Sequence, residues 1–501
     1  MQAQLQQLKD ILAEVDDLMR AAAVLQWDLE TYMPPGGVEA RSQQLATLER
    51  LAHTRFVSEE VGRLLEDLHP LLEQEEPDSN TACLLRVTQS EYEKECKLPG
   101  ELVAELARKT ALAHTIWQNA RETKTFSTFQ PLLNELVDLM RRKAENLGYT
   151  DHIYDPLLDV YEPQMKTAEV AAIFKTLKDA LVPLIQQIAE RRDVVQDKVF
   201  QGHFDVKRQW DFSLEVLREI GYDFRCGRQD ASAHPFTTSF SPDDVRITTR
   251  VASEHFSAGL FGSIHEGGHA LYEQGIPREF VRTPLNNGAS SAIHESQSRF
   301  WENVVGRSRP FWTHFLPRLQ RFYPEQLANA TVDQVYQAVN VVQPSFIRVE
   351  ADEVTYNLHV FLRFELETDL LAGAIEVKDL PELWNQKMNI YLGITPPDDA
   401  LGVLQDVHWS AGLFGYFPTY ALGNVLALQF EQRMRQDWPG WDTEVAQGKF
   451  APILHWQREH IHAHGRKFAP QELVQRVTGE TINPQPYIAY LEAKYGELYG
   501  L

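Results

Sequence analysis

The run His265-Glu266-Gly267-Gly268-His269 combines residue types and a spacing that point to metal chemistry. It lies inside FSAGLFGSIHEGGHALYEQG, a stretch whose pattern predicts a helix. Residues four positions apart lie one above the other on a helix, so both imidazoles can reach one metal ion while Glu266 flanks the same opening. Such a motif is typical of zinc sites in which the glutamate acts as general base on a water molecule.

The two glycines inside this motif bear on whether it arises by chance. A match to three specified residues in five occurs on the order of a few times in a hundred proteins. Glycine costs roughly 1 kcal/mol relative to alanine inside a helix. Two in succession, Gly267 and Gly268, therefore indicate the close approach of a substrate or of another backbone and favour the metal interpretation.

A catalytic zinc ion needs three protein ligands and one open position. Glu295 is the candidate for the third ligand, because it lies in a segment that reads as the next helix, after a loop broken by proline and glycine. His294 competes with it, but adjacent side chains on a helix point about 100° apart, so only one of the two can face the metal. Spacing favours Glu295 and leaves His294 open.

Two arginines stand among many apolar neighbours, Arg246 and Arg348. They could form internal ion pairs that support the fold. Alternatively, a guanidinium near the metal would suit the free C-terminus of a peptide, because it binds a carboxylate through two parallel hydrogen bonds. His234 and His408 also occur in this half of the chain, and an isolated histidine is more often a structural residue than a ligand.

The elements that must position these residues are mostly helices. Between 221 and 251 the sequence pattern changes, and apolar residues there are evenly spaced. This spacing predicts a small antiparallel β ribbon. No flexible linker interrupts the chain, so we expect 1–501 to form a single domain, with 1–200 as an N-terminal helical part and 201–501 carrying the metal motif. Apolar residues at three- and four-residue steps predict helices over 5–29, 38–55, 56–74, 79–97, 99–121, 128–147, 166–194, 252–275, 289–305, 351–372, 380–394, 412–436, 471–478 and 485–499.

Composition excludes several classes of protein. The chain has 501 residues, of which 43% are hydrophobic and 24% charged, as in ordinary globular proteins. The net charge of -23 repels phosphate backbones and anionic lipids, so we expect neither nucleic acid nor a membrane surface as a partner. Three scattered cysteines and the lack of a signal-like start or of ~18 uninterrupted apolar residues favour a reducing, cytoplasmic location.

Several further motifs occur in a specific order along the chain. With the histidine motif, the set resembles the carboxypeptidase Taq family of zinc metallocarboxypeptidases over essentially the whole chain, and no block departs from the family pattern. The blocks are Trp27-Asp28, Met33-Pro34, His234-Pro235-Phe236, Asp244-Val245-Arg246-Ile247-Thr248, His294-Glu295-Ser296-Gln297-Ser298, Ile347-Arg348-Val349-Glu350-Ala351-Asp352, Gly402 to Trp409, and Gly415 to Tyr420.

The resemblance implies a mainly α, helix-rich peptidase fold with a deep active-site cleft, similar to the neurolysin and angiotensin-converting-enzyme type, and a homodimer. Residues 1–200 would form a wall of that cleft. The metal would be held by His265, His269 and Glu295, which decides between Glu295 and His294. We expect one zinc ion per chain, with cobalt or manganese as possible replacements.

The resemblance also implies roles in catalysis and substrate binding. In the wider group of peptidases a histidine and a tyrosine hydrogen-bond the scissile carbonyl, and His408 and Tyr420 are similar to that pair. Arg348, together with Arg246, would hold the terminal carboxylate, and His234 belongs to a block that we assign to substrate binding.

These expectations predict a metallocarboxypeptidase that releases single residues from peptides with a free C-terminus, with Glu266 as general base. An oligopeptidase that cuts inside short peptides would use the same metal residues, and it would accept a C-terminally amidated peptide that the carboxypeptidase refuses. A helical protein that only binds peptides is a third possibility, in which Glu266 would have no task.

Overall fold

The computed structural model describes residues 1–501 and contains two compact units that alternate along the chain. Unit 1 comprises 1–96, 197–339 and 430–479, and unit 2 comprises 97–196, 340–429 and 480–501. The single domain predicted for 1–501 and its seam near residue 200 stay predictions. The predicted cleft wall and catalytic part stay predictions.

Unit 1 contains most of the helices and the sheet. Within it, α12 begins at a cap in which the Ser290 hydroxyl accepts the backbone N–H of Ile293, and α10 ends at Gly221 with a left-handed φ of 108°. The helices are α1 (Gln2–Thr31), α2 (Val38–Phe56), α3 (Glu59–Leu68), α4 (Leu71–Gln74), α5 (Asn80–Cys96), α10 (Val206–Ile220), α11 (Phe256–Gly275), α12 (Ser291–Arg299), α13 (Arg309–Phe322), α14 (Val332–Ala338), α18 (Trp441–Ala446), α19 (Ala451–His460) and α20 (Pro470–Thr478).

The sheet has three strands, β1 (Gly227–Ala231), β2 (Thr237–Ser241) and β3 (Asp244–Thr249), in the order β1-β3-β2. Strands β2 and β3 pair antiparallel, whereas β1 pairs with β3 in parallel. The predicted antiparallel ribbon is therefore correct for β2 and β3, and β1 extends it into a mixed sheet. Alternation in the sequence does not encode the direction in which a strand joins its neighbour.

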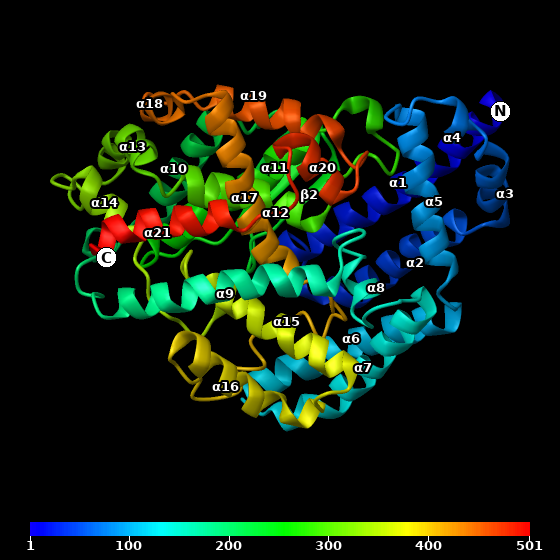
Figure 1. Ribbon diagram of the computed structural model, residues 1–501, viewed down its shortest axis with the longest axis horizontal. Helices are drawn as coiled ribbons and strands as arrows, with labels where there is room; N and C mark the ends of the chain where they lie inside the picture. Colours follow the sequence, from blue (N-terminus) through cyan, green and yellow to red (C-terminus); the bar gives the residue numbers. More distant parts are fainter. The chain divides into compact units, whose positions relative to one another are not determined.

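Helix α11, labelled in the upper middle of Figure 1, lies against β2, β3, α10 and α12. Its glycines permit this close packing. A Cβ on Gly267 would lie 2.5 Å from Cδ2 of Leu217 on α10, and a Cβ on Gly268 would lie 2.6 Å from the Cα of Ser298 on α12. The expectation that another backbone approaches this pair of glycines is confirmed for Gly268.

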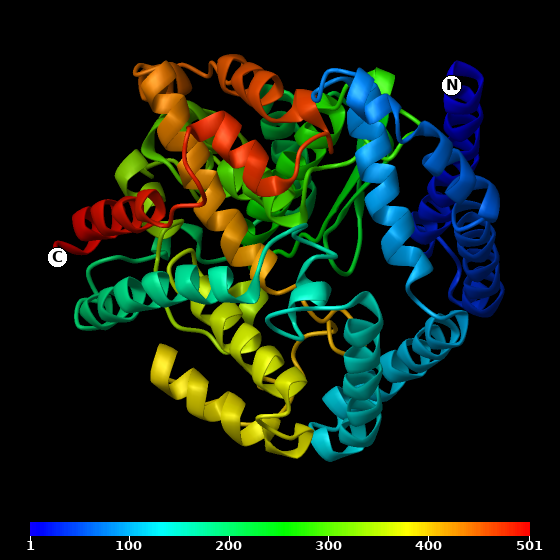
Figure 2. The ribbon, with the colours of Figure 1, turned by 45° about the vertical axis from the view of Figure 1, so that its right-hand side comes forward.

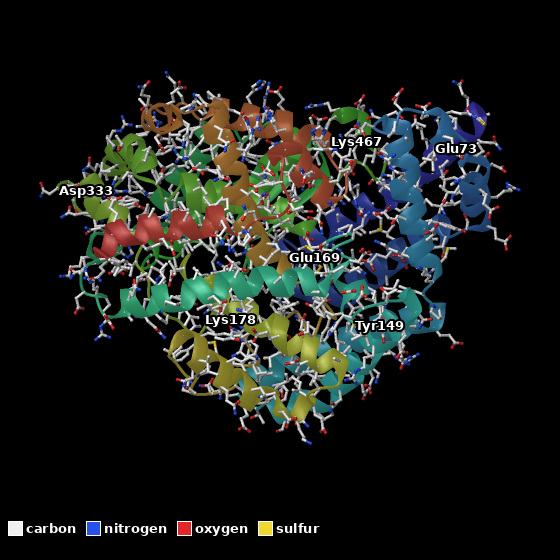
Figure 3. The ribbon with its side chains drawn as sticks, in the orientation of Figure 1. Glu73, Tyr149, Glu169, Lys178, Asp333 and Lys467 are labelled. Atoms are coloured by element: carbon white, nitrogen blue, oxygen red, sulfur yellow. The ribbon has the colours of Figure 1, made fainter.

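Unit 2 is built from helices around the buried helix α15, which ends at Gly373 with a left-handed φ of 75°. Helices α15 and α16, both yellow in Figure 2, lie side by side. At the start of α9 the Glu169 carboxylate, labelled in Figure 3, accepts the backbone N–H of Lys166. The helices are α6 (Gly100–Glu122), α7 (Phe126–Leu147), α8 (Asp155–Leu158), α9 (Thr167–Ala189), α15 (Tyr356–Ala372), α16 (Leu380–Leu392) and α21 (Gln485–Tyr499), with α17 (Pro418–Asp437) passing from unit 2 into unit 1.

The predicted helix-rich class is confirmed, while several boundaries differ. The helix predicted from residue 412 begins at Pro418, because Gly412 and Gly415 adopt left-handed φ values of 70° and 94°. Six helices were not predicted: α8, α10, α13, α14, α18 and α19. Pro317 inside α13 masked its helical pattern, and α14 and α18 are too short to show a period. None of the helices is long and apolar enough to cross a lipid bilayer.

Candidate active site

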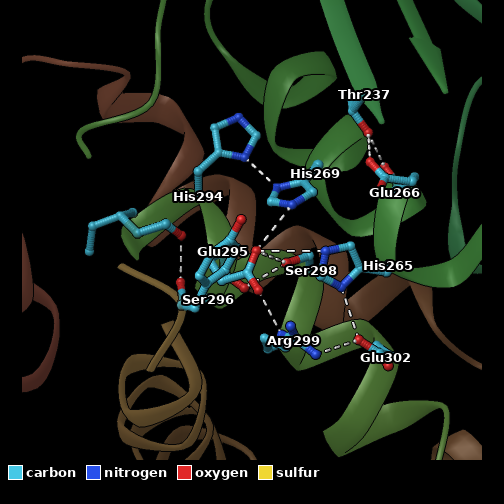
Figure 4. A network of polar contacts seen from close by, with 12 residues as sticks. Thr237, His265, Glu266, His269, His294, Glu295, Ser296, Ser298, Arg299 and Glu302 are labelled. Atoms are coloured by element: carbon cyan, nitrogen blue, oxygen red, sulfur yellow. Dashed lines mark hydrogen bonds and ion pairs between the residues drawn. The ribbon is translucent and has the colours of Figure 1, made fainter. Parts of the chain in front are cut away.

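In unit 1 the structure brings together His265, His269 and Glu295, the three residues predicted to bind metal (Figure 4). Their ligand atoms all lie within 4.8 Å of one another. Oε2 of Glu295 is 3.6 Å from Nε2 of His265 and 3.3 Å from Nε2 of His269. Helix α11 supplies both histidines from one face, and α12 presents the glutamate to them across the contact at Gly268.

The chemistry and spacing of this donor set fit a zinc-type ion. Two imidazole nitrogens and a carboxylate oxygen are the ligands of many catalytic metal sites. Donor atoms bound tetrahedrally at ~2.0–2.1 Å lie roughly 3.3–3.4 Å apart. The two nitrogen–oxygen distances to Glu295 are 3.3 Å, within this range, and 3.6 Å, slightly longer. The residues present can therefore hold such an ion.

The ring orientation of His265 is fixed by a second carboxylate. Its Nδ1 lies 2.9 Å from Oε2 of Glu302, which follows α12 in a π-helical turn (Phe300–Val305). An Nδ1–H donated to Glu302 leaves Nε2 as the lone-pair atom that faces Glu295. Burial alone would lower the pKa of His265, but the carboxylates of Glu295 and Glu302 outweigh burial and raise it.

His269 is oriented by a different arrangement, through His294. Nδ1 of His269 lies 2.6 Å from Nδ1 of His294, whose Nε2 lies 2.8 Å from Oε1 of Glu273. If His294 donates to the Glu273 carboxylate, it accepts the Nδ1–H of His269, and Nε2 of His269 then faces Glu295 as a lone pair. His294 thus contacts the His–His–Glu group through Nδ1 of His269. Burial lowers the pKa of His269 to about 4.

Glu266 lies on α11 next to the histidines and is held by the sheet. The hydroxyl of Thr237 on β2 lies 2.6 Å from Oε2 of Glu266 and donates to it (Figure 4). Burial is the main cause that raises the pKa of the Glu266 carboxyl, against the lowering effects of His265 and Thr237. A buried carboxylate in a fixed orientation beside a metal-binding group suits a general base.

In unit 2 the structure brings together His408 and Tyr420. Nε2 of His408 lies 3.1 Å from the hydroxyl oxygen of Tyr420, and the imidazole stacks on Phe417 with ring centroids 4.4 Å apart. Burial lowers the pKa of His408 to about 3. The imidazole is therefore neutral around pH 7 and can donate a hydrogen bond without carrying a charge.

Arg348 is buried in the same unit and has an internal carboxylate partner. Its Nε and Nη2 donate to Oδ1 of Asp406 at 3.1 and 2.9 Å, and its Nη1 donates to the hydroxyl of Tyr356. Its guanidinium carbon lies 4.6 Å from the ring centroid of Tyr420. Arg363 binds the other oxygen of Asp406 at 2.6 Å. The guanidinium of Arg348 therefore helps to hold the group around Tyr420, as the ion-pair interpretation of the sequence expected.

Arg246 and His234 belong to unit 1. Arg246 on β3 forms a two-point contact with Asp244, and its guanidinium carbon lies 4.4 Å from the ring centroid of Trp27. His234 is exposed in the connection from β1 to β2, where its backbone carbonyl accepts the hydroxyl of Ser232. Neither side chain contacts the His–His–Glu group.

Sequence reasoning did not single out Thr237, Glu302 or Glu273. A signal existed for Glu302, because it follows Glu295 by seven positions and so lies on the same face of a helix. Glu273 follows His269 by four positions in the same way. Thr237 could not be found, because its contact with Glu266 joins a strand to a helix far along the chain.

The group consists of two histidines and a glutamate that can bind one metal ion, and a further glutamate lies beside them on the same helix as the histidines. This arrangement defines a metal-dependent hydrolase. A profile of the family described as "Carboxypeptidase Taq (M32) metallopeptidase" matches residues 7–495. The chain belongs to this family and is a metal-dependent carboxypeptidase, a hydrolase of peptide bonds.

Individual relatives agree with this assignment. "Thermostable carboxypeptidase 1" of Thermus thermophilus is 42% identical, covering 100% of this chain and 99% of its own, and "Carboxypeptidase 1" of Bacillus subtilis is 39% identical, covering 98% and 97%. The crystal structure of an M32 carboxypeptidase from Deinococcus radiodurans is 39% identical with a TM-score of 0.96, covering 100% of both chains. These relatives do not favour the oligopeptidase alternative.

Proposed function

We propose that this protein is a zinc carboxypeptidase in which His265, His269 and Glu295 bind one zinc ion and Glu266 is the general base. The observation that carries the proposal is the His–His–Glu group, in which both imidazoles are oriented so that Nε2 faces the carboxylate of Glu295. When bound, the zinc ion supplies Lewis-acid chemistry, polarising the peptide carbonyl and lowering the pKa of water. The donor set also accepts cobalt or manganese.

The residues of the chain then move the proton and bind the substrate. Glu266, oriented by Thr237, takes a proton from the attacking water and delivers it to the leaving amine. His408 and Tyr420 donate hydrogen bonds to the oxyanion, and each well-placed donor is worth about 3 kcal/mol.

We propose that Arg348 and Arg246 bind the terminal carboxylate of the peptide and that His234 contributes to substrate binding. A guanidinium has five N–H groups. Arg348 uses three of them on Asp406 and Tyr356, so two remain for a substrate. Arg246 likewise uses two on Asp244. A peptide that continued past its terminal residue would leave these donors unpaired, which is why the enzyme would act only on a free C-terminus.

Mass spectrometry of peptide digests tests this function. The zinc-loaded protein should shorten a peptide by one residue at a time from its free C-terminus, and it should leave the C-terminal amide of the same peptide intact. Glu266→Gln should abolish cleavage while still binding zinc. Internal cuts in both peptides would instead establish an oligopeptidase, and cleavage by the Gln variant at the wild-type rate would remove Glu266 from its role.

Two further parts of the proposal have their own measurements. Elemental analysis of the protein isolated from its native host should give one zinc per chain, which His265→Ala, His269→Ala and Glu295→Ala each lose. We also propose a homodimer, and multi-angle light scattering should give twice the mass of the 57.5 kDa chain. A monomer mass across the concentration range would refute it.

A further inference from the structure

The segment from Asp406 to Tyr420 in unit 2 is bound by the side chains of two residues of α15 that lie four positions apart. Arg363 and Glu367 are both 0% exposed. Arg363 binds the carboxylate of Asp406 at the start of the segment. Glu367 binds its middle, where Oε1 accepts the indole N–H of Trp409 at 2.8 Å and Oε2 accepts the backbone N–H of Gly415 at 3.1 Å.

Glu367 also joins this segment to a third part of the unit. Its Oε2 accepts the hydroxyl of Tyr154 at 2.7 Å. Gly415 has a left-handed φ of 94°, and a Cβ at this position would lie 2.5 Å from the carbonyl oxygen of Leu157. The turn at Gly415 therefore packs closely against the backbone of the segment that carries Tyr154. The Glu367 carboxylate accepts a hydrogen bond from each of these two segments.

Burying the Glu367 carboxylate to make these contacts costs free energy of folding. All three of its donors are neutral, and Arg363, one turn earlier on α15, donates instead to Asp406 and to the carbonyl of His359. Burial raises the pKa of Glu367 to about 7, although Tyr154, Gly415 and Trp409 oppose the rise. Near and above that pH the folded protein carries a buried charge that costs free energy of folding. Such a cost is typical of a residue retained for function.

We propose that Glu367 is a positioning residue for the reaction: it holds Trp409 and Gly415 so that His408 and Tyr420 keep their mutual hydrogen bond and their orientation. The inference rests on the roles proposed above for His408 and Tyr420. His408 directly precedes Trp409, and the turn at Gly415 leads into Tyr416, Phe417 and the first turn of α17, which carries Tyr420.

This role gives the activity a dependence on pH. An ionised Glu367 accepts all three donors, whereas a protonated Glu367 brings a hydrogen of its own into a ring of donors and must displace one of them. The titratable and charged groups that interact with it are Tyr154 and Tyr161 from the chain before α9 and Arg363 from its own helix. Arg363 in turn binds Asp406, whose Oδ1 lies 3.9 Å from Nδ1 of His408. The tyrosines are neutral and Asp406 is ionised across this range, so the carboxyl of Glu367 is the group that changes charge.

Steady-state kinetics of the zinc-loaded enzyme between pH 5 and 9 test the proposal. Glu367→Gln should lower kcat on the order of 10- to 100-fold, with a much smaller change in KM and full zinc content. Tyr154→Phe removes a donor that lowers the pKa of Glu367, so it should move the acid limb of kcat to higher pH and leave the alkaline plateau near that of the wild type. Glu365→Gln, on the same helix but paired with Lys178 and Lys387, is the matched control and should keep the wild-type kcat and pH profile.

Two outcomes would overturn the proposal. One is a Glu367→Gln enzyme with the kcat and pH profile of the wild type. The other is an acid limb that stays in place in Tyr154→Phe. His408→Ala and Tyr420→Phe, measured in parallel, separate this failure from failure of the proposed function: if those two variants keep full kcat, the roles of His408 and Tyr420 are wrong. If they lose kcat while the Glu367 and Tyr154 variants behave as the wild type, only the positioning role is wrong.

Discussion

Nδ1 of His265 and Oε2 of Glu302 lie 2.9 Å apart, and the same carboxylate oxygen lies 3.1 Å from Nη1 of Arg299. Arg299 in turn donates its Nε to Glu295, so one arginine connects the carboxylate that orients His265 with the carboxylate of the His–His–Glu group. Arg299, Arg307 and His265 hold the pKa of Glu302 well below its ordinary value, against the effect of burial, and Glu302 is therefore ionised.

Glu302→Gln should weaken metal binding. The amide keeps the shape of the side chain but loses the charge that fixes the tautomer of His265, and loss of such a partner costs about 10- to 100-fold in metal affinity. Competition with a chelating dye measures the zinc dissociation constant directly. The expected result is an increase of that size with an unchanged circular dichroism spectrum.

Glu325→Gln is the matched control, because Glu325 is an exposed glutamate of unit 1 outside the metal group. It should leave the zinc affinity unchanged. If Glu302→Gln bound zinc as tightly as this control, the orienting role of Glu302 would be wrong.

Gly268→Ala should destabilise the protein. The added Cβ would lie 2.6 Å from Cα of Ser298 and must push α12 away from α11, and overpacking of this kind costs about 1–3 kcal/mol. Gly262 on the same helix has room, since a Cβ there would come no closer than 3.6 Å to a neighbour, so Gly262→Ala should be neutral or stabilising by up to ~1 kcal/mol. Thermal unfolding of both variants checks the contrast, and equal melting temperatures would contradict it.

The grouping of His265, His269 and Glu295 could be predicted from sequence because its information is local. His265 and His269 are one turn apart on one helix, and the family resemblance decided between the adjacent residues His294 and Glu295. The helix-rich class followed from the same periodicity. What the sequence could not show is contact between distant segments, such as Thr237 with Glu266 or Glu367 with Gly415, because no pattern along the chain records which strand or turn packs on which helix. The parallel pairing of β1 was missed for the same reason.

Lys494→Met should destabilise unit 2. Nζ of Lys494 on α21 lies 2.7 Å from Oε2 of Glu353, and both side chains are almost fully buried. Removal of one partner leaves a buried charge unpaired, which costs about 3–5 kcal/mol. Urea unfolding should show this loss and should show most of it recovered in the double variant Glu353→Gln, Lys494→Met.

Lys175→Met, which breaks the exposed pair with Asp179 on α9, is the comparison for that experiment. An exposed pair contributes about 0–1 kcal/mol, so this variant should stay near the wild type. A double variant less stable than Lys494→Met alone would show that the two side chains do not compensate one another.

Asp406→Asn should destabilise the protein in a pH-dependent way. Burial would raise the pKa of Asp406, but Arg363 and Arg348 outweigh it and hold the pKa far below the ordinary value of an aspartate. In the unfolded chain the carboxyl titrates near ~3.9. A group with a depressed folded pKa contributes stability above its unfolded pKa and loses that contribution as the pH falls toward the folded value.

The asparagine variant leaves two buried guanidinium groups without their carboxylate, so near pH 7 it should be about 3–5 kcal/mol less stable than the wild type. The gap should stay constant from pH 7 to about 5 and narrow below about 4, as the unfolded wild-type chain takes up the proton. Urea unfolding at pH 7, 5, 4 and 3 measures it, with Asp193→Asn, an exposed position in unit 2, expected to remain within about 0.5 kcal/mol of the wild type. A gap that widened on acidification would show that Asp406 is not the ionised partner of these arginines.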